Sequence, residues 1–215
     1  MKQIFKKDHK HFKVKDYIKS GDLFQLYKDN NSGIVWTFLD KNHNHEYYYS
    51  SEKYIPHKEK KGFFGFLYLF VQKIMFRYKL KNLKNHINKN KIVLDYGSGD
   101  GRFAEYLNQL QIKTMTYDPL VKKLDESDPN SYQAPENQID TIMMWHVIEH
   151  IPDLDSSIKA IYNSIKNKGS LVIAVPNIDS FDSKHYKESW AGFDVPRHLY
   201  HFNHESLINF IEKQG

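Results

Sequence analysis

Three glycines at alternate positions, Gly97, Gly99 and Gly101, follow an apolar run that ends in an acid, in the stretch VLDYGSGDGRFAEYL. The apolar run predicts a buried strand, and the pattern after the glycines predicts a helix. Glycine has no side chain and permits positive φ, so a ligand can lie directly against such a backbone. In open parallel sheets, ligands bind beyond the carboxyl ends of the strands. We therefore predict a cofactor site at this loop, with a purely structural turn as the alternative.

The spacing of the glycines excludes two phosphate-binding motifs. A P-loop requires G-x-x-x-x-G-K-[ST], and no Lys-Ser or Lys-Thr follows the loop. A dinucleotide fingerprint requires G-x-G-x-x-G, in which the third glycine lets helix and strand approach closely. The corresponding position here is Arg102, which has a large side chain. The observed pattern is G-x-G-x-G with Asp95 two residues before it.

This pattern resembles motif I of the class I S-adenosylmethionine-dependent methyltransferases, and the resemblance implies S-adenosylmethionine as the cofactor. This cofactor carries no phosphate, and its cationic amino group needs acceptors such as the Asp95 carboxylate. Its ribose diol needs an acid at the end of the next strand, about 20 residues on; Asp118 lies 21 positions after Gly97. The cofactor-binding residues predicted on this basis are Asp95, Tyr96, Gly97, Ser98, Gly99, Gly101, Asp118, Trp145 and His146.

Strands and helices alternate from residue 91 onward. The expected order is strand (IVLDYG), helix (RFAEYLNQLQ), strand (KTMTYDP), an irregular stretch, strand (IDTIMMWHV), helix (LDSSIKAIYNSIKNKG), strand (SLVIAVPN) and a final helix (ESLINFIEKQG). Short, nearly all-apolar strands are typical of a sheet covered on both faces. We predict an α/β fold: a Rossmann-like, doubly wound, mostly parallel sheet with helices on both faces, formed by residues 89–215.

Residues 1–88 are expected to form a separate hairpin and helical cap. Alternating apolar residues flank an Asn/Ser/Gly turn cluster within Phe24–Phe38, which indicates a β-hairpin. Helical sequence runs from about Gly62 to Asn88. Its apolar part, Phe63–Phe76, would span only ~21 Å as a helix, whereas a transmembrane helix needs about 20 apolar residues. We expect this helix to pack on the sheet; contact of its basic-flanked apolar part with an anionic membrane surface is the alternative.

Composition excludes several other classes of function. The formal charge of +5 is spread along the chain, and no nucleic-acid-binding signature accompanies it, so no nucleic-acid partner is expected. Cysteine is absent, which removes disulfides, thiolate zinc sites and cysteine nucleophiles. The N-terminus MKQIFKKDHKHFKVK lacks an apolar signal-peptide region. We therefore predict a cytoplasmic protein.

The resemblance extends well beyond the glycine loop. IDTIMMWHVIEHIPDLDSSI is similar to the fourth-strand segment of the ubiquinone-biosynthesis O-methyltransferases, and WAGFDVPRHLYHF is similar to a segment of the type 23 methyltransferase domains. Three departures follow. The cysteines of the relatives' N-terminal zinc ribbon are missing, so no zinc is expected there. The interval from Asp118 to Asp140 predicts an abbreviated helix and strand. The chain ends at Gly215, so either it is a truncated form of a longer protein or the sheet lacks its last strands.

Three residues just beyond the fourth strand, His146, Glu149 and His150, are the catalytic candidates. A general base assists methyl transfer to a hydroxyl. If a helical turn begins at Val147, the two histidines share one face at i and i+4. The ubiquinone-type resemblance allows a divalent ion here, although we predict no metal ligand; an ordering role for Glu149 and His150 is the alternative. H-x-x-E-H also matches the inverted zinc peptidases, but Pro152 prevents the long helix that they need.

Two further groups are candidates for contact with the substrate. Trp190, Arg197, His198 and His201 lie in the segment similar to the type 23 domains, where Arg197 would hold an acidic group and the histidines would shuttle protons. Tyr54 and His57 precede the glycine loop and would close over the cofactor. Packing roles are the alternative for all of them.

Together these features predict a methyltransferase that transfers the methyl group of S-adenosylmethionine to a small-molecule acceptor, with oxygen as the acceptor atom by analogy. A catalytically inactive binding or scaffold protein that keeps the fold is the alternative.

Overall fold

The computed structural model describes residues 9–40, 45–49, 63–118 and 136–215. The chain divides into two compact units. We call residues 56–145 and 160–173 the parallel unit, and residues 1–55, 146–159 and 174–215 the antiparallel unit, after the sheet that each contains. The expected boundary between a cap and a cofactor domain at residue 88 stays a prediction.

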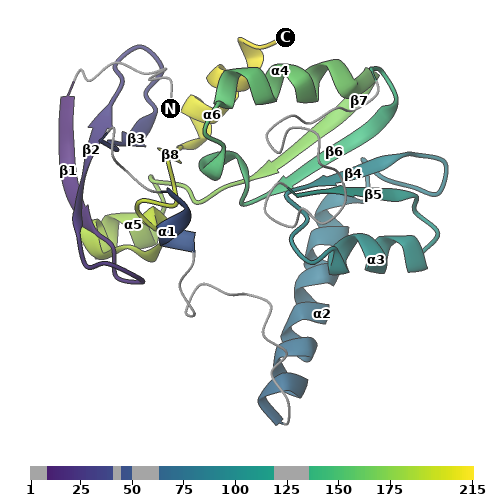
Figure 1. Ribbon diagram of the computed structural model, residues 1–215. Coiled ribbons are helices and arrows are strands. Elements are labelled where there is room, and N and C mark those ends of the chain that lie inside the picture. The colour runs from purple at the N-terminus through teal and green to yellow at the C-terminus, as the bar shows by residue number, and fades with distance from the viewer. Residues whose placement is uncertain (1–8, 41–44, 50–62, 119–135) are drawn as a thin grey trace. The chain divides into compact units, whose positions relative to one another are not determined.

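The parallel unit contains a four-stranded sheet in the order β5-β4-β6-β7 (Figure 1). Its strands are β4 (Val93–Tyr96), β5 (Thr114–Tyr117), β6 (Ile139–Trp145) and β7 (Ile165–Ala174). The first of these, β4, lies between β5 and β6 and is parallel to both, with Asp95 opposite Thr116 and Met143. All four residues of β4 are buried, as its apolar sequence predicts.

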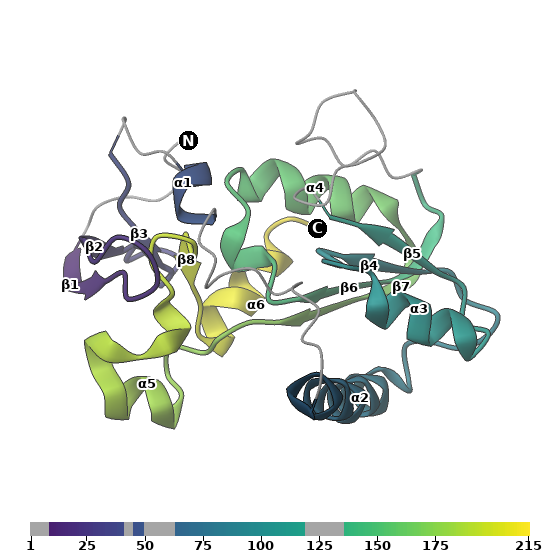
Figure 2. The same ribbon diagram turned by 60° about the horizontal axis from the view of Figure 1, so that its bottom comes forward.

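Helices flank this sheet, which confirms the predicted α/β, Rossmann-like class. They are α2 (Phe63–Leu83), α3 (Arg102–Gln109) and the part of α4 (Leu154–Ser164) that belongs to this unit, residues 160–164; α2 and α3 lie on one face and this part of α4 on the other (Figures 1 and 2). Helix α3 turns Phe103, Ala104 and Leu107 toward the sheet, because residues at i, i+1 and i+4 share one side of a helix. The core that results contains Leu83, Ile87, Val93, Phe103, Leu107, Ile112 and Met143.

One predicted boundary in this unit is wrong. The helix expected to reach Gly169 ends at Ser164, and β7 begins at once, five residues before the expected strand. The sequence IKNK at residues 165–168, in which only the isoleucine is apolar, shows no period that would indicate a strand. Contacts with β6 decide the outcome instead, because Lys166 Nζ donates to Asp140 Oδ2 at 2.8 Å and Gln138 N donates to Ser164 O at 3.1 Å.

Helix α2 packs on the core through Phe76, Leu80 and Leu83, as expected for a lead-in helix. The opposite side leaves apolar residues exposed, among them Val71, Ile74, Met75 and Tyr78. Contact of this side with an anionic membrane surface stays a prediction. Among the described helices, none combines the length and the apolar character needed to cross a membrane.

The antiparallel unit contains the second sheet, in the order β1-β2-β3-β8. Its strands are β1 (His9–Lys15), β2 (Leu23–Lys28), β3 (Val35–Thr37) and β8 (Tyr200–His201), and all neighbours are antiparallel. The predicted hairpin is confirmed as β2 and β3. In its turn, Asp29 Oδ2 accepts from Ser32 N at 2.8 Å, and Gly33 has the positive φ of 72° that favours glycine.

Short helices complete this unit. They are α1 (His45–Tyr49), α5 (Phe181–Tyr186), α6 (His204–Glu212) and the 3-10 turns η1 (Ile148–His150), η2 (Lys187–Ser189) and η3 (Ala191–Phe193). The final predicted helix is confirmed as α6. A capping box begins it, in which Asn203 and Ser206 exchange hydrogen bonds between side chain and backbone.

A buried ion pair joins the two ends of this unit. Arg197 is 1% exposed, and its Nη2 donates to Asp16 Oδ1 at 3.0 Å and to Asp194 Oδ1 at 2.6 Å. Asp16 also accepts from the amides of Ile18, Lys19 and Ser20, so it orders the turn after β1. A buried charge is tolerated only with such partners. Arg197 therefore fastens the segment before β8 to the N-terminal sheet.

Replacing Arg197 tests this structural role. Arg197→Met leaves two carboxylates without their cation, and we expect it to lower the free energy of unfolding by about 3–5 kcal/mol. Arg102→Met removes an exposed ion pair with Asp100 and serves as the control, with an expected loss below about 1 kcal/mol. Chemical denaturation followed by tryptophan fluorescence measures both. Equal, small losses for the two variants would contradict the role.

Candidate functional site

The glycine loop joins the end of β4 to the start of α3, as predicted. Gly97, Gly99 and Gly101 have φ of 77°, 57° and 77°, all in the left-handed region where other residues are strained. The amides of Gly97 and Ser98 donate to Tyr117 O at 2.7 and 3.1 Å. The loop backbone is therefore tied to the end of the neighbouring strand β5.

Asp118, the acid predicted to bind a ribose, lies against this loop. Its Oδ2 accepts a hydrogen bond from Gly99 N at 2.7 Å. The spacing of 21 residues therefore brings the carboxylate to the same edge of the sheet as the glycines. A role of Asp118 in binding a ligand stays a prediction.

Asp95, at the end of β4, is a buried carboxylate with 3% exposure. Burial raises the pKa of Asp95 to about 6, the cation of Lys79 opposes this shift, and the charge of Asp118 adds to it. The Asp95 carboxyl group is therefore mostly ionised at pH 7, and it gains a proton near pH 6, a pH at which binding can be measured. A bound cation would stabilise the ionised form.

Lys79 is a further candidate for the cofactor site, which the sequence alone did not indicate as a candidate. Its ammonium lies over the rings of Trp145 and Phe103, with the nitrogen 4.8 and 5.0 Å from their centroids. Burial lowers the pKa of Lys79, and Asp95 counteracts the shift. The helical period could have indicated that Lys79 faces the core, because it lies three residues after Phe76 and four before Leu83.

Trp145, predicted at the cofactor site, ends β6. Its indole Nε1 is buried and, among the described residues, has no hydrogen-bond partner. A buried donor without an acceptor is costly, and a ligand can supply the acceptor. The parallel unit thus offers a bare loop, two carboxylates, an ammonium and an indole donor: Gly97–Gly101, Asp95, Asp118, Lys79 and Trp145. These groups fit a cationic nucleoside that has a diol and a carboxylate.

His146, in the antiparallel unit, follows Trp145 in a left-handed conformation with φ of 58°. Its amide donates to Ala174 O at 2.9 Å, and its side chain is 61% exposed. Glu149 is 1% exposed, with Oε1 3.5 Å from His146 Nδ1. The helical turn expected from Val147 is only the 3-10 turn η1, which begins at Ile148. His146 and His150 therefore do not share a helical face, and that expectation is wrong.

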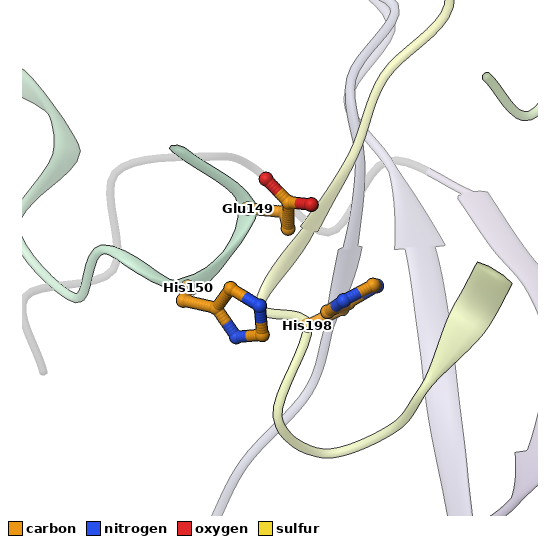
Figure 3. Close-up of side chains that lie close together, drawn as sticks. All are labelled: Glu149, His150 and His198. Carbon is orange, nitrogen blue, oxygen red and sulfur yellow. The ribbon is translucent and has the colours of Figure 1, made fainter. Parts of the chain in front are cut away.

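His150 instead lies beside His198, from the segment before β8 (Figure 3). His150 Nδ1 lies 3.0 Å from Arg197 O and 3.0 Å from Tyr49 Oη. Burial lowers the pKa of His150 to about 4, with a smaller contribution from His198. Burial also lowers the pKa of His198, whose Nδ1 lies 2.9 Å from Gly192 O. Both rings are therefore neutral at pH 7.

The structure excludes the zinc-peptidase interpretation of H-x-x-E-H. That motif requires its histidines one turn apart on a long helix. Here the motif ends in the three-residue turn η1, Ile151 leaves the turn in extended conformation, and Pro152 lies in a bend.

The other predicted substrate residues are mostly interior. The expected acid clamp, Arg197, is instead the buried partner of Asp16 and Asp194, because its guanidinium is needed to neutralise them. His201 is 3% exposed, has a pKa well below the ordinary value because of burial, and contacts Thr37 Oγ1 at 3.0 Å. Trp190 is half-buried against Phe193. Tyr54 and His57, and the predicted short helix and strand after Asp118, lie outside the described residues.

The fold and the glycine loop agree with the predicted class of S-adenosylmethionine-dependent methyltransferases. The sequence model of a family described as a methyltransferase domain, Methyltransf_23, matches residues 69–215. The chain belongs to this family, with S-adenosylmethionine as the cofactor. The likeness to the ubiquinone-biosynthesis group within the class stays a prediction.

Solved structures share the fold. A SAM-dependent methyltransferase from Archaeoglobus fulgidus is 24% identical with a TM-score of 0.52, over 69% of this chain and 74% of that one. Phosphoethanolamine N-methyltransferase 2 from Haemonchus contortus, in complex with S-adenosyl-L-methionine, is 17% identical with a TM-score of 0.51; the match covers 95% of this chain but 55% of that one. No curated protein sequence matches the chain in the corresponding search.

The raised pKa of Asp95 predicts how cofactor affinity depends on pH. Between about pH 5 and 7 the amino group of the cofactor stays protonated, whereas Asp95 gains a proton as the pH falls through about 6. Because the cation favours the ionised carboxylate, binding should release protons near pH 6 and weaken about tenfold from pH 7 to pH 5.

Calorimetry in buffers of different ionisation enthalpy measures both quantities. Asp95→Asn is the control: its affinity should be lower and independent of pH over this range. A wild-type affinity that is equal at pH 5 and pH 7 would contradict the role of Asp95.

Proposed function

We propose that the chain transfers the methyl group of S-adenosylmethionine to the oxygen of a small-molecule acceptor. One observation carries the cofactor part of the proposal: the loop of left-handed glycines is hydrogen-bonded to the end of β5 through Gly97 N and Ser98 N, and Gly99 N contacts the Asp118 carboxylate at 2.7 Å. Family membership supplies the reaction class. The acceptor atom rests on analogy with relatives.

Different residues of the parallel unit would bind different parts of the cofactor. Asp118 would accept hydrogen bonds from the ribose hydroxyls, and the glycine loop would leave room for the adenosine. Asp95 would hold the amino group. Lys79 would neutralise the cofactor's carboxylate, and Trp145 Nε1 would donate to it or to a bound water. When bound, the cofactor supplies a methyl group on a positively charged sulfur.

His146 is the best candidate for the base among the described residues after β6. It is exposed, so an acceptor hydroxyl can reach it, whereas His150 is buried and neutral. Glu149 Oε1, 3.5 Å from His146 Nδ1, would stabilise the imidazolium that forms when Nε2 takes the hydroxyl proton. His150 would then position the turn η1. A base in this position assists displacement at the methyl carbon.

Variants of Asp118 test the cofactor site. Asp118→Asn keeps an acceptor for Gly99 N but loses the charge and half of the acceptor capacity for a diol, and Asp118→Ala loses all three. We expect S-adenosylmethionine affinity to fall about tenfold and about a hundredfold, respectively, in line with the loss of one and of two hydrogen bonds to a charged group.

The matched control is Asp100→Asn on the same loop, whose carboxylate pairs with the exposed Arg102. Its affinity should stay within about twofold of wild type. Equal losses for Asp100 and Asp118 variants in calorimetry would contradict the assignment.

His146→Ala tests the base. We expect kcat for a hydroxyl acceptor to fall by about 10²–10⁴, while the variant still binds S-adenosylmethionine. Release of S-adenosylhomocysteine with a panel of small alcohols and phenols measures kcat. Cofactor binding without turnover on any acceptor would instead support the inactive, scaffold alternative.

A further inference from the structure

We propose that Glu149, His150 and His198 form a binding site for a divalent transition-metal ion of the Zn²⁺ type. One ligand atom from each residue lies within 4.8 Å of the ligand atoms of the other two. All three residues belong to the antiparallel unit, from η1 and from the segment before β8 (Figure 3). The inference does not rest on methyl transfer or on the acceptor.

The carboxylate of Glu149 is the first independent sign of a missing cation. It is 1% exposed, and neither of its oxygens has a hydrogen-bond donor among the described residues. Its nearest described basic group is His146, whose Nδ1 lies 3.5 Å from Oε1 and whose side chain is mostly exposed. A buried carboxylate normally has donors or coordinates a metal.

The hydrogen bonds of the two histidines are the second sign. Each Nδ1 lies against a backbone carbonyl: that of His150 is 3.0 Å from Arg197 O, and that of His198 is 2.9 Å from Gly192 O. A carbonyl can only accept, which assigns the proton to each Nδ1. Tyr49 Oη also lies 3.0 Å from His150 Nδ1, and its own proton points to Arg197 O at 3.3 Å, so it accepts from Nδ1. A neutral imidazole has one N–H, and therefore each Nε2 carries a lone pair and cannot donate to Glu149.

Metal-ligating histidines use this same arrangement. They donate the other ring N–H to a carbonyl or carboxylate, which fixes the tautomer and the direction of the free nitrogen. Asp194 Oδ2 lies 4.0 Å from His198 Nε2. Because Nε2 carries no proton in this tautomer, it faces a second carboxylate to which it cannot donate.

The donor atoms indicate which ions fit. Two imidazole nitrogens and one carboxylate leave at least one coordination position open and suit Zn²⁺ and its neighbours in the first transition row. Mg²⁺ and Ca²⁺ prefer all-oxygen sets. These three ligands are not the three residues of the H-x-x-E-H motif. His198, 48 positions after His150, takes the place of His146.

The experiment uses the full chain without a histidine tag. After chelation and dialysis, we expect calorimetry to show one tight Zn²⁺ site per chain, elemental analysis to recover one equivalent, and Zn²⁺ to raise the melting temperature. Co²⁺ should give visible bands typical of four or five ligands including nitrogen. Mg²⁺ should compete with neither ion.

Variants then test the ligand set. Glu149→Gln and His198→Gln should each weaken Zn²⁺ binding at least tenfold. His185→Gln changes an exposed histidine of the same unit and is the matched control; it and His146→Ala should stay within about threefold of wild type.

Three results would overturn the proposal. The first is no stoichiometric Zn²⁺ in the wild-type chain. The second is a Co²⁺ spectrum like that of the hydrated ion, which decides the matter even where a variant fails to fold. The third is loss of binding in His146→Ala but not in His198→Gln, which would place the ion on another set of residues.

Discussion

The hydrogen bond from Gly99 N to the Asp118 carboxylate is the interaction on which the cofactor site depends. It fastens a loop of left-handed glycines to the end of β5, where the amides of Gly97 and Ser98 are also bound. The backbone there is both bare and fixed, which lowers the cost of ordering it around a ligand. The charge of Asp118 also adds to the raised pKa of Asp95, so the two carboxylates form one electrostatic system with Lys79.

The antiparallel unit uses buried charge in a different way. Arg197 neutralises Asp16 and Asp194, and its own carbonyl receives the Nδ1–H of His150. The residue expected to bind substrate thus orders the segment that carries His198. Arg197 O and Gly192 O accept from Nδ1 of His150 and His198. The Nε2 atoms of both rings therefore carry lone pairs and no proton, and the Glu149 carboxylate has no hydrogen-bond donor among the described residues. The side chain of Arg197 thus has a structural role, whereas Glu149, His150 and His198 carry the groups that we propose bind a metal ion.

Much of the parallel unit could be predicted because its signals are local. An apolar run, a glycine spacing and an acid one strand later predicted β4, the loop and the position of Asp118. Contacts between distant segments could not be predicted. The pairing of β8 with β3, the approach of His198 to His150 and the early start of β7 depend on partners far away in the sequence. Lys79 was missed because a lysine is normally assigned to a solvated surface, whereas aromatic rings hold its ammonium here.

A crystal structure of the protein with S-adenosylhomocysteine tests the central claim most directly. The account predicts the adenosine against Gly97–Gly101, both ribose hydroxyls within hydrogen-bond distance of Asp118, and the amino group beside Asp95. A ligand bound elsewhere, or a ribose whose hydroxyls make no contact with Asp118, would contradict it.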